Sequence, residues 1–222
     1  MLMLWVDIPG CYSDCMSYAR SVARPITHSR ESLGLIVPFD SDYNGEYIPS
    51  EVYMERAILE GTRAVSLGQH PVGAVVTTVE IVEDIMTRKK IMCEFGLTAA
   101  GNNADFYSGG HAETISIWNA ERLVGGKDHL GELHGVLYTT HEPCPMCAGA
   151  IANSKLAGVV IGTGVDDARE LARRGVRWRN NSVSGIDIIR GVEQKGRPPK
   201  FIIEGFMREE CRALLELARS LK

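Results

Sequence analysis

The sequence predicts an α/β sandwich with a central sheet, because short apolar runs typical of strands alternate with segments of helical periodicity. With 222 residues, 45% of them hydrophobic, the chain can form one domain with a sizeable core and an appendage. The alternating pattern occupies residues 49–222, which we expect to be the domain. Residues 1–48 carry scattered prolines and a polar run, and we expect them to form an N-terminal extension that wraps the domain.

Two kinds of pattern predict the individual elements. Apolar residues at a helical period predict a first helix from Pro49 to Ser66 and later helices at 111–123, directly after Cys144, and at 207–221. Short apolar runs predict strands at 73–76, 93–100, 135–140, 159–162, 186–189 and 201–203. Residues 79–91 are charged and alternate poorly, so we expect a protruding hairpin or loop there. An Arg-rich region covers residues 167–181.

Three potential metal ligands are the most informative residues of the chain: His111, Cys144 and Cys147. The two cysteines are three positions apart, so at the first turn of a helix both sulfurs can reach one metal ion. Pro143 suits a helix start, and a helix N-terminus stabilises the thiolates that bind metal. His111 follows a turn and is expected to begin a second helix, which would place the metal between two helix N-termini. Zinc is tetrahedral, so three ligands leave a fourth position for water.

Glu113, two positions after His111, is the expected proton shuttle. On the first helical turn its carboxylate can point beside the metal, take a proton from water and pass it to a leaving amine. The pattern H-x-E…P-C-x-x-C is the known signature of zinc-dependent nucleobase deaminases. It predicts that an exocyclic amino group is replaced by oxygen and released as ammonia.

A structural zinc site is the alternative interpretation of Cys144 and Cys147. A zinc ribbon or knuckle usually has a fourth protein ligand, often from a second C-x-x-C pair. The other cysteines show no such pair: Cys11, Cys15, Cys93 and Cys211. Glu113 would also be unnecessary in a domain that keeps zinc for structure and binds a partner, so the catalytic interpretation is favoured. Cys11 and Cys15 allow a second metal, but free thiols are the favoured interpretation, and we expect one Zn2+ per chain.

Composition limits the setting in which the protein works. The net charge is −4, so no global basic excess demands a nucleic-acid partner. Six cysteines, two of them assigned to metal, fit a reducing compartment better than a disulfide framework. We recognise no signal peptide and no apolar stretch of membrane-spanning length, so we expect a cytoplasmic protein without membrane contact.

Several further segments resemble the cytidine-deaminase-like superfamily, within it the branch that contains tRNA adenosine deaminases and bacterial guanine deaminases. Residues 70–76 (HPVGAVV) are similar to the family's F-P-V-G-A-V strand, and residues 140–151 (THEPCPMCAGAI) to its E-P-C-x-M-C-A-G-A run. Residues 101–103, 154–162 and 205–215 extend the likeness. The resemblance implies a three-layer α/β/α sandwich with a central mixed sheet, in which residues 49–222 are a zinc-dependent deaminase domain.

The same resemblance implies a set of functional residues and a partner. It implies zinc on His111, Cys144 and Cys147, with Glu113 as proton shuttle. Further residues are implied to contact the substrate: the side chain of Asn102 or Asn103 by a hydrogen bond, and the backbone around Ala112 and Pro143 as pocket lining. A homodimer is also implied.

Other candidates for substrate contact lie close to the predicted ligands. His141 and Glu142 directly precede the zinc-binding segment, and Glu142 could accept a hydrogen bond from a ring N–H or instead cap the helix that follows. A planar base favours an aromatic or apolar lid, for which the chain offers Phe106, Tyr107 and Trp178. Ordinary packing is the more common role for each of these aromatic residues.

The remaining question is the substrate, and charge separates the alternatives. RNA binding needs a basic surface, and the one dense basic run contains Arg169, Arg173, Arg174, Arg177 and Arg179. Asp166, Asp167 and Glu170 balance it, which favours a solvated helix face. Aromatic residues make up only 7% of the chain, which leaves few platforms for RNA bases. We therefore favour a free purine-type base or nucleoside, guanine-like first, and keep a tRNA adenosine-to-inosine deaminase as the alternative.

Overall fold

The computed structural model describes residues 35–36, 47–83, 90–94, 99–102, 109–176, 178, 183–191 and 199–220. Nearly all of the expected N-terminal extension lies outside these ranges, so its wrapping of the domain stays a prediction. Among the described residues, no helix is both long enough and apolar enough to cross a bilayer.

A mixed sheet of five strands forms the centre of the domain. Its order is β5 (Ala99–Asn102), β2 (Gly73–Thr77), β6 (Val136–His141), β7 (Gly158–Thr163) and β8 (Phe201–Glu204). β2 is antiparallel to both β5 and β6, whereas β6, β7 and β8 run parallel to one another. The expected central mixed sheet is thereby confirmed.

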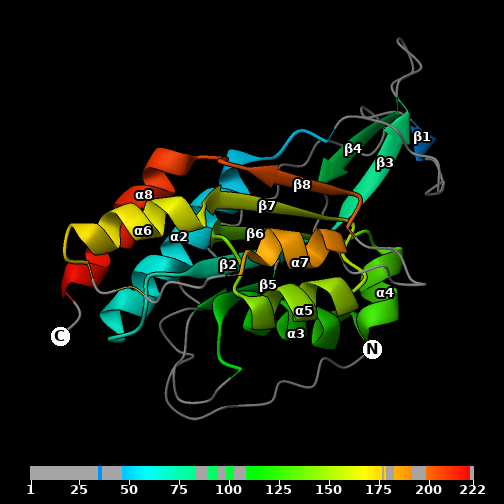
Figure 1. The fold of residues 1–222 in the computed structure, drawn as a ribbon. Coiled ribbons are helices and arrows are strands. Elements are labelled where there is room, and N and C mark those ends of the chain that lie inside the picture. The colour runs from blue at the N-terminus through cyan, green and yellow to red at the C-terminus, as the bar shows by residue number, and fades with distance from the viewer. Residues whose placement is uncertain are drawn as a thin grey trace.

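Helices cover both faces of this sheet, which gives the expected three layers (Figure 1). One side carries α3 (Ala112–Val124), α5 (Pro145–Asn153) and α7 (Gly185–Gly191). The other carries α2 (Glu51–Ser66) and α8 (Arg208–Glu216), with α6 (Val165–Arg173) packed on α8. The remaining helical segments of the described residues are α4 (Lys127–Glu132), which the sequence did not predict, and a 3-10 turn, η2 (Leu217–Ser220), that continues the predicted closing helix.

The alternation of side chains along β2 explains why a hydrophobic cluster forms on each face of the central sheet. Ala74 and Val76 point to the side of α3 and α5, where they join Ile117 and Ile151. Val75 points to the opposite side and packs with residues of α2, β6, β7 and α8, among them Met54, Tyr138, Val160 and Cys211. A strand that is apolar on both faces is what a sheet between two helical layers requires. The predicted strand at 73–76 is thus buried on both sides.

A small second sheet lies beside the central one and corrects one prediction. It consists of β1 (Leu35–Ile36), β3 (Val79–Glu83) and β4 (Lys90–Glu94), so the hairpin expected at residues 79–91 is present. The single strand predicted at residues 93–100 is wrong. Its first residues end β4, which pairs with β3, and its last residues start β5, which pairs with β2 in the central sheet.

The predicted strand at residues 186–189 is also wrong, because these residues form helix α7. Ile186 and Ile189, three positions apart, are buried, while Asp187 between them is exposed. That is helical spacing, which a four-residue apolar run does not distinguish from a strand. Gly185 makes the packing possible, since a Cβ at this position would lie 1.8 Å from the carbonyl oxygen of Pro143.

An ion-pair cluster fastens α6 to α8. The side chain of Asp167 is only 3% exposed and accepts hydrogen bonds from Arg208 at 2.8 and 3.1 Å. Arg212 approaches the same carboxylate at 3.5 Å. Burial by itself would raise the pKa of Asp167, but the hydrogen bonds from Arg208 and the Gly164 N–H, with the two arginine charges, outweigh it and lower that pKa.

We expect Asp167→Asn to lower the free energy of unfolding near neutral pH by about 1–3 kcal/mol, because charge-assisted hydrogen bonds are lost. The lowered pKa means that the ionised carboxylate stabilises the fold above its unfolded pKa of about 3.9, and that this contribution is lost as the pH falls through the folded value. Urea unfolding of both proteins at several pH values measures it. The difference should shrink below about pH 4; a difference that persists there contradicts the assignment.

Candidate metal centre and active site

The three predicted metal ligands converge in the structure. The Nδ1 atom of His111 lies 3.5 Å from the Sγ of Cys144 and 3.5 Å from the Sγ of Cys147, and the two sulfurs are 3.5 Å apart. Tetrahedral zinc with ordinary Zn–S and Zn–N bonds holds such atoms roughly 3.6–3.8 Å apart. Among the described residues, this is the group of His, Cys and acidic side chains whose ligand atoms lie close enough for one ion. The donor set and its spacing therefore fit zinc.

Both ligand-bearing segments are helix starts, as expected. His111 occupies the cap position of α3 in extended backbone geometry, and Cys144 does the same for α5. Cys147 lies one turn into α5 and is buried. The helix begins directly after Cys144, as predicted, but the proline in its first turn is Pro145 and not Pro143. The partial positive charge of the two helix N-termini stabilises negative charge on the thiolates between them.

The electrostatics of the two cysteines reflect their contact. The Sγ atoms of Cys144 and Cys147 lie within hydrogen-bond distance, and this contact is the largest cause that lowers the pKa of Cys144 to about 4. The same interaction raises the pKa of Cys147. Zinc binds cysteine as the thiolate, so metal binding at this pair is coupled to the loss of the thiol protons.

Glu113 is buried beside the ligands, in the first turn of α3. Its Oε2 atom accepts a hydrogen bond from the Cys147 thiol at 3.5 Å. Burial raises the pKa of this carboxyl to about 7. A carboxyl group at this place can accept a proton from, or return it to, a group that reacts at the metal position.

Three of the residues predicted to contact substrate lie next to the ligands in the sequence or the fold, and their role stays a prediction. Ala112 is the first residue of α3 and is buried. Pro143 lies between Glu142 and Cys144, and its carbonyl oxygen contacts α7. The backbone of Asn102 ends β5 opposite Gly73, which places it at the edge of the sheet near the ligands. Other residues named from the sequence lie outside the described ranges: Asn103, Phe106, Tyr107, Cys11 and Cys15.

His141 is the last residue of β6 and is buried. Its Nδ1 atom lies 3.0 Å from the Oγ1 of Thr163, and burial lowers the pKa of the ring to about 4. The ring packs edge-on against Trp178, with 4.9 Å between ring centres. His141 is therefore a neutral ring held in place by a hydroxyl and an aromatic side chain.

His70 was not named as a functional residue from the sequence, yet its ring also packs against Trp178. Its ring centre lies 5.5 Å from that of Trp178. The position of His70 just before β2 could have indicated this. Because β2 and β6 are antiparallel, the start of β2 lies near the end of β6, where His141 is. The resemblance supports the same position, where the family pattern F-P-V-G-A-V has an aromatic residue.

Comparison with known proteins places this geometry in a family. The sequence profile of the cytidine and deoxycytidylate deaminase zinc-binding region matches residues 49–163. The tRNA-specific adenosine deaminase of Rickettsia felis is 34% identical over 130 residues, which are 59% of this chain and 81% of that protein. The tRNA-specific adenosine deaminase of Bacillus subtilis is 36% identical over 113 residues, 50% of this chain and 60% of that protein.

Solved structures share the fold. Guanine deaminase from Nitrosomonas europaea superposes with a TM-score of 0.56 at 20% identity, over 85% of this chain and 95% of the other. A structure from a study of A-to-I editing by tRNA:A34 deaminases gives a TM-score of 0.50 at 21% identity, over 75% of this chain and all of the other. The profile match includes all three ligands, and the chain belongs to the cytidine and deoxycytidylate deaminase family of zinc-dependent hydrolases that act on C–N bonds of cyclic amidines.

Proposed function

We propose that this protein replaces the exocyclic amino group of a free purine-type base or nucleoside, a guanine-like base first, with oxygen from water and releases ammonia. The observation that supports the reaction is the buried carboxylate of Glu113 beside the three ligands. A purely structural zinc site has no use for a buried acid in that place.

The residues present fit the chemistry. When bound, zinc supplies a Lewis acid that activates water for attack on the ring carbon. Glu113 holds the proton that this water loses and delivers it to the departing nitrogen. The ligands and the carboxylate lie at the starts of α3 and α5, and these rigid helices keep the reacting groups at fixed distances from one another. One C–N bond breaks, one C–O bond forms, and no oxidant or reductant is needed.

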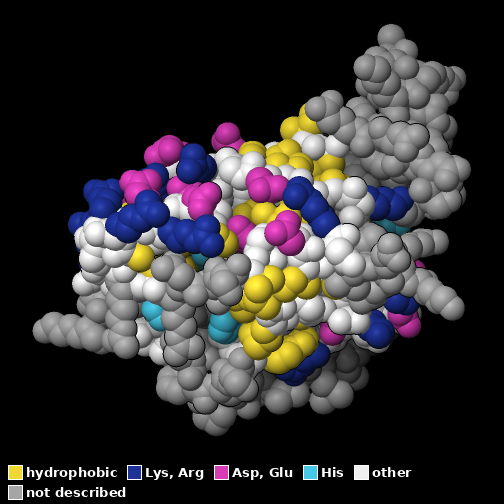
Figure 2. Space-filling model, viewed as in Figure 1, with side chains coloured by type: hydrophobic (Ala, Val, Ile, Leu, Met, Phe, Trp, Pro, Cys, Tyr) yellow, Lys and Arg dark blue, Asp and Glu magenta, His cyan; other side chains and the backbone are white. Residues whose placement is uncertain are grey.

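Surface charge supports a small, uncharged substrate. On α6, Arg169 pairs with Asp166 at 3.0 Å. Arg174, just after α6, lies 3.9 Å from Glu170 and 3.6 Å from Glu216. Figure 2 shows basic and acidic side chains mixed over α6 and α8 at its upper left. This part of the Arg-rich run is therefore balanced by acids, as the sequence interpretation expected, and the net charge of −4 repels a polyanion at long range.

The second candidate is adenosine deamination in a tRNA. The names of the relatives from Rickettsia felis and Bacillus subtilis favour it, at 34% and 36% identity. Both candidates use the same zinc chemistry and differ in whether the base arrives free or on a polyanion.

A homodimer, implied by the resemblance, also belongs to the proposal. Helix α3 exposes Trp118 and Leu123, and α5 exposes Met146. Large apolar side chains on neighbouring helices are the kind of surface that a second copy would cover.

We expect Glu113→Gln to keep zinc and fold but to lower ammonia release by roughly 10²–10⁴-fold or more, because the proton shuttle is lost. Ammonia assays and metal analysis of the same preparation measure both properties. Glu121→Gln, the same change on the same helix, should retain the wild-type rate. Near wild-type turnover by Glu113→Gln would rule out the proposed role.

Metal analysis should find about one zinc per chain. His111→Ala or Cys144→Ala should lose the metal and the activity, and should unfold more easily, because the ion links two helices. Cys211→Ala, which removes a thiol on α8, should keep zinc. Two tightly held zinc ions per chain would instead indicate a second site at Cys11 and Cys15.

The two substrate candidates differ in their response to salt. A neutral base releases no counterions, so turnover should depend little on salt, and replacing Arg173, Arg174 and Arg177 with Ala should have a mild effect. A tRNA substrate would show affinity that falls steeply with salt and with the same substitutions. The assay screens guanine, adenine, cytosine, their nucleosides and a tRNA transcript. Inosine in the transcript, with no ammonia from any small substrate, would establish the second candidate.

A further inference from the structure

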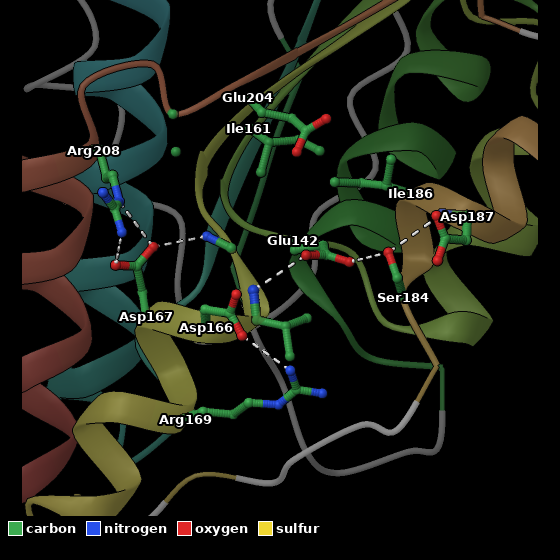
Figure 3. Close-up of a pocket in the computed structure, with 14 residues that line it drawn as sticks. Glu142, Ile161, Asp166, Asp167, Arg169, Ser184, Ile186, Asp187, Glu204 and Arg208 are labelled. Atoms are coloured by element: carbon green, nitrogen blue, oxygen red, sulfur yellow. Dashed lines mark hydrogen bonds and ion pairs between the residues drawn. The ribbon is translucent and has the colours of Figure 1, made fainter.

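Glu142 lies two residues before the ligand Cys144, on the segment that joins β6 to α5, and it is buried. It forms part of the wall of a cavity of about 610 Å³ between α6, α7 and the segment that leads from β8 to α8 (Figure 3). The described residues that line this cavity include none of the three zinc ligands. Glu142 therefore faces away from the metal, toward α6 and α7, which carry none of the zinc ligands.

Both carboxylate oxygens of Glu142 accept hydrogen bonds inside the protein, as Figure 3 shows in part. Oε2 accepts from the backbone N–H of Val165, the first residue of α6, at 3.1 Å. Oε1 accepts from the Ser184 hydroxyl at 2.7 Å and from the backbone N–H of Gly185, the first residue of α7, at 3.1 Å. One side chain thus satisfies donors at the starts of two helices. Because all three groups donate, the position suits a side chain that offers two acceptor oxygens.

The same segment is held at two more points. The backbone N–H of Glu142 donates to the carbonyl oxygen of Thr163 at 2.8 Å. The carbonyl oxygen of Pro143 touches the backbone of Gly185 so closely that a Cβ there would lie 1.8 Å away. The next residue in the chain is the ligand Cys144. A shift of α7 or of the start of α6 would therefore move the backbone that sets the place of the Cys144 sulfur.

We propose that Glu142 is a positioning residue for zinc, which holds the Cys144 segment at the distance from His111 that tetrahedral coordination needs. Its carboxylate fixes the segment by hydrogen bonds to α6 and α7 and does not touch the substrate. Outer partners that orient ligands commonly change metal affinity by 10–100-fold when they are removed. This inference rests on the zinc site of the proposed function and is independent of which base is the substrate.

Glu142→Gln is the sharpest test. Glutamine has the size of glutamate, but one of its two acceptor oxygens is replaced by an NH2 group. This NH2 donor would then face one of the N–H or O–H donors that the carboxylate now binds. We expect zinc affinity, measured by competition with a chelator, to fall by roughly 10–100-fold. The matched control is Glu204→Gln, which changes another acid of the same cavity whose partner is Arg190 at 2.9 Å on the surface. Its zinc affinity should equal that of the wild type.

A second readout separates positioning from ordinary stabilisation. Thermal unfolding is recorded for each protein with excess zinc and with excess chelator. Positioning predicts that zinc raises the Tm of Glu142→Gln less than that of the wild type, because weaker binding gives less stabilisation. An equal loss of Tm in both conditions, with unchanged zinc affinity, would show a merely structural role and overturn the proposal.

Substrate contact is the other alternative for Glu142. A raised KM with wild-type zinc affinity would support that role and overturn positioning. If Glu142→Gln does not fold, Ser184→Ala is the deciding variant, because it removes the hydroxyl that donates to Oε1 of Glu142 and leaves the glutamate itself unchanged. We expect a smaller loss of zinc affinity in that variant, and an unchanged affinity would overturn the proposal. Failure to find a substrate would leave these metal measurements standing, so the two proposals can fail separately.

Discussion

The convergence of two helix starts at one edge of the sheet is the constraint on which the site depends. His111 caps α3 and Cys144 caps α5, so the metal position exists only if both helices lie in their observed places on the sheet. Close backbone contact sets the place of α3. A Cβ on Gly101 of β5 would lie 2.4 Å from the carbonyl oxygen of Ala112, so this helix start is pressed directly against the strand. The ligand distances are therefore a consequence of helix–sheet packing.

Burial gives the site its chemical character. The carboxyl group of Glu113 and the thiol of Cys147 are buried, and the thiol of Cys144 is half-buried, in a place where an isolated charge is costly. Two features offset that cost before any metal is present: the hydrogen bond between the sulfurs and the partial positive charge of two helix starts. The same burial holds the pKa of Glu113 near the pH at which a proton shuttle works well. Packing and reactivity thus have a common physical origin.

The carboxylates near the site divide into two kinds. Glu113 faces the ligands and keeps its contact with Cys147, whereas the oxygens of Glu142 accept from backbone and hydroxyl donors of α6 and α7. The neutral ring of His141 packs with Trp178, which also contacts His70. An uncharged aromatic group of this kind suits a planar base, free or within RNA. Surface charge, rather than the metal centre, separates the two proposed substrates.

The sequence alone determined the metal ligands and the alternation of strands and helices, because those signals are local. Three-residue spacing brings Cys144 and Cys147 to one face of a helix wherever that helix lies. Tertiary structure decided the features that local pattern leaves open. Residues 186–189 are apolar enough for a strand or a helix, and in the fold they form a helix that packs Ile186 and Ile189 into the core beside α5. The hydrogen-bond donors to Glu142 lie 23, 42 and 43 residues further along the chain. At such separations the local sequence does not determine the partners of a carboxylate; the folded arrangement of α6 and α7 does.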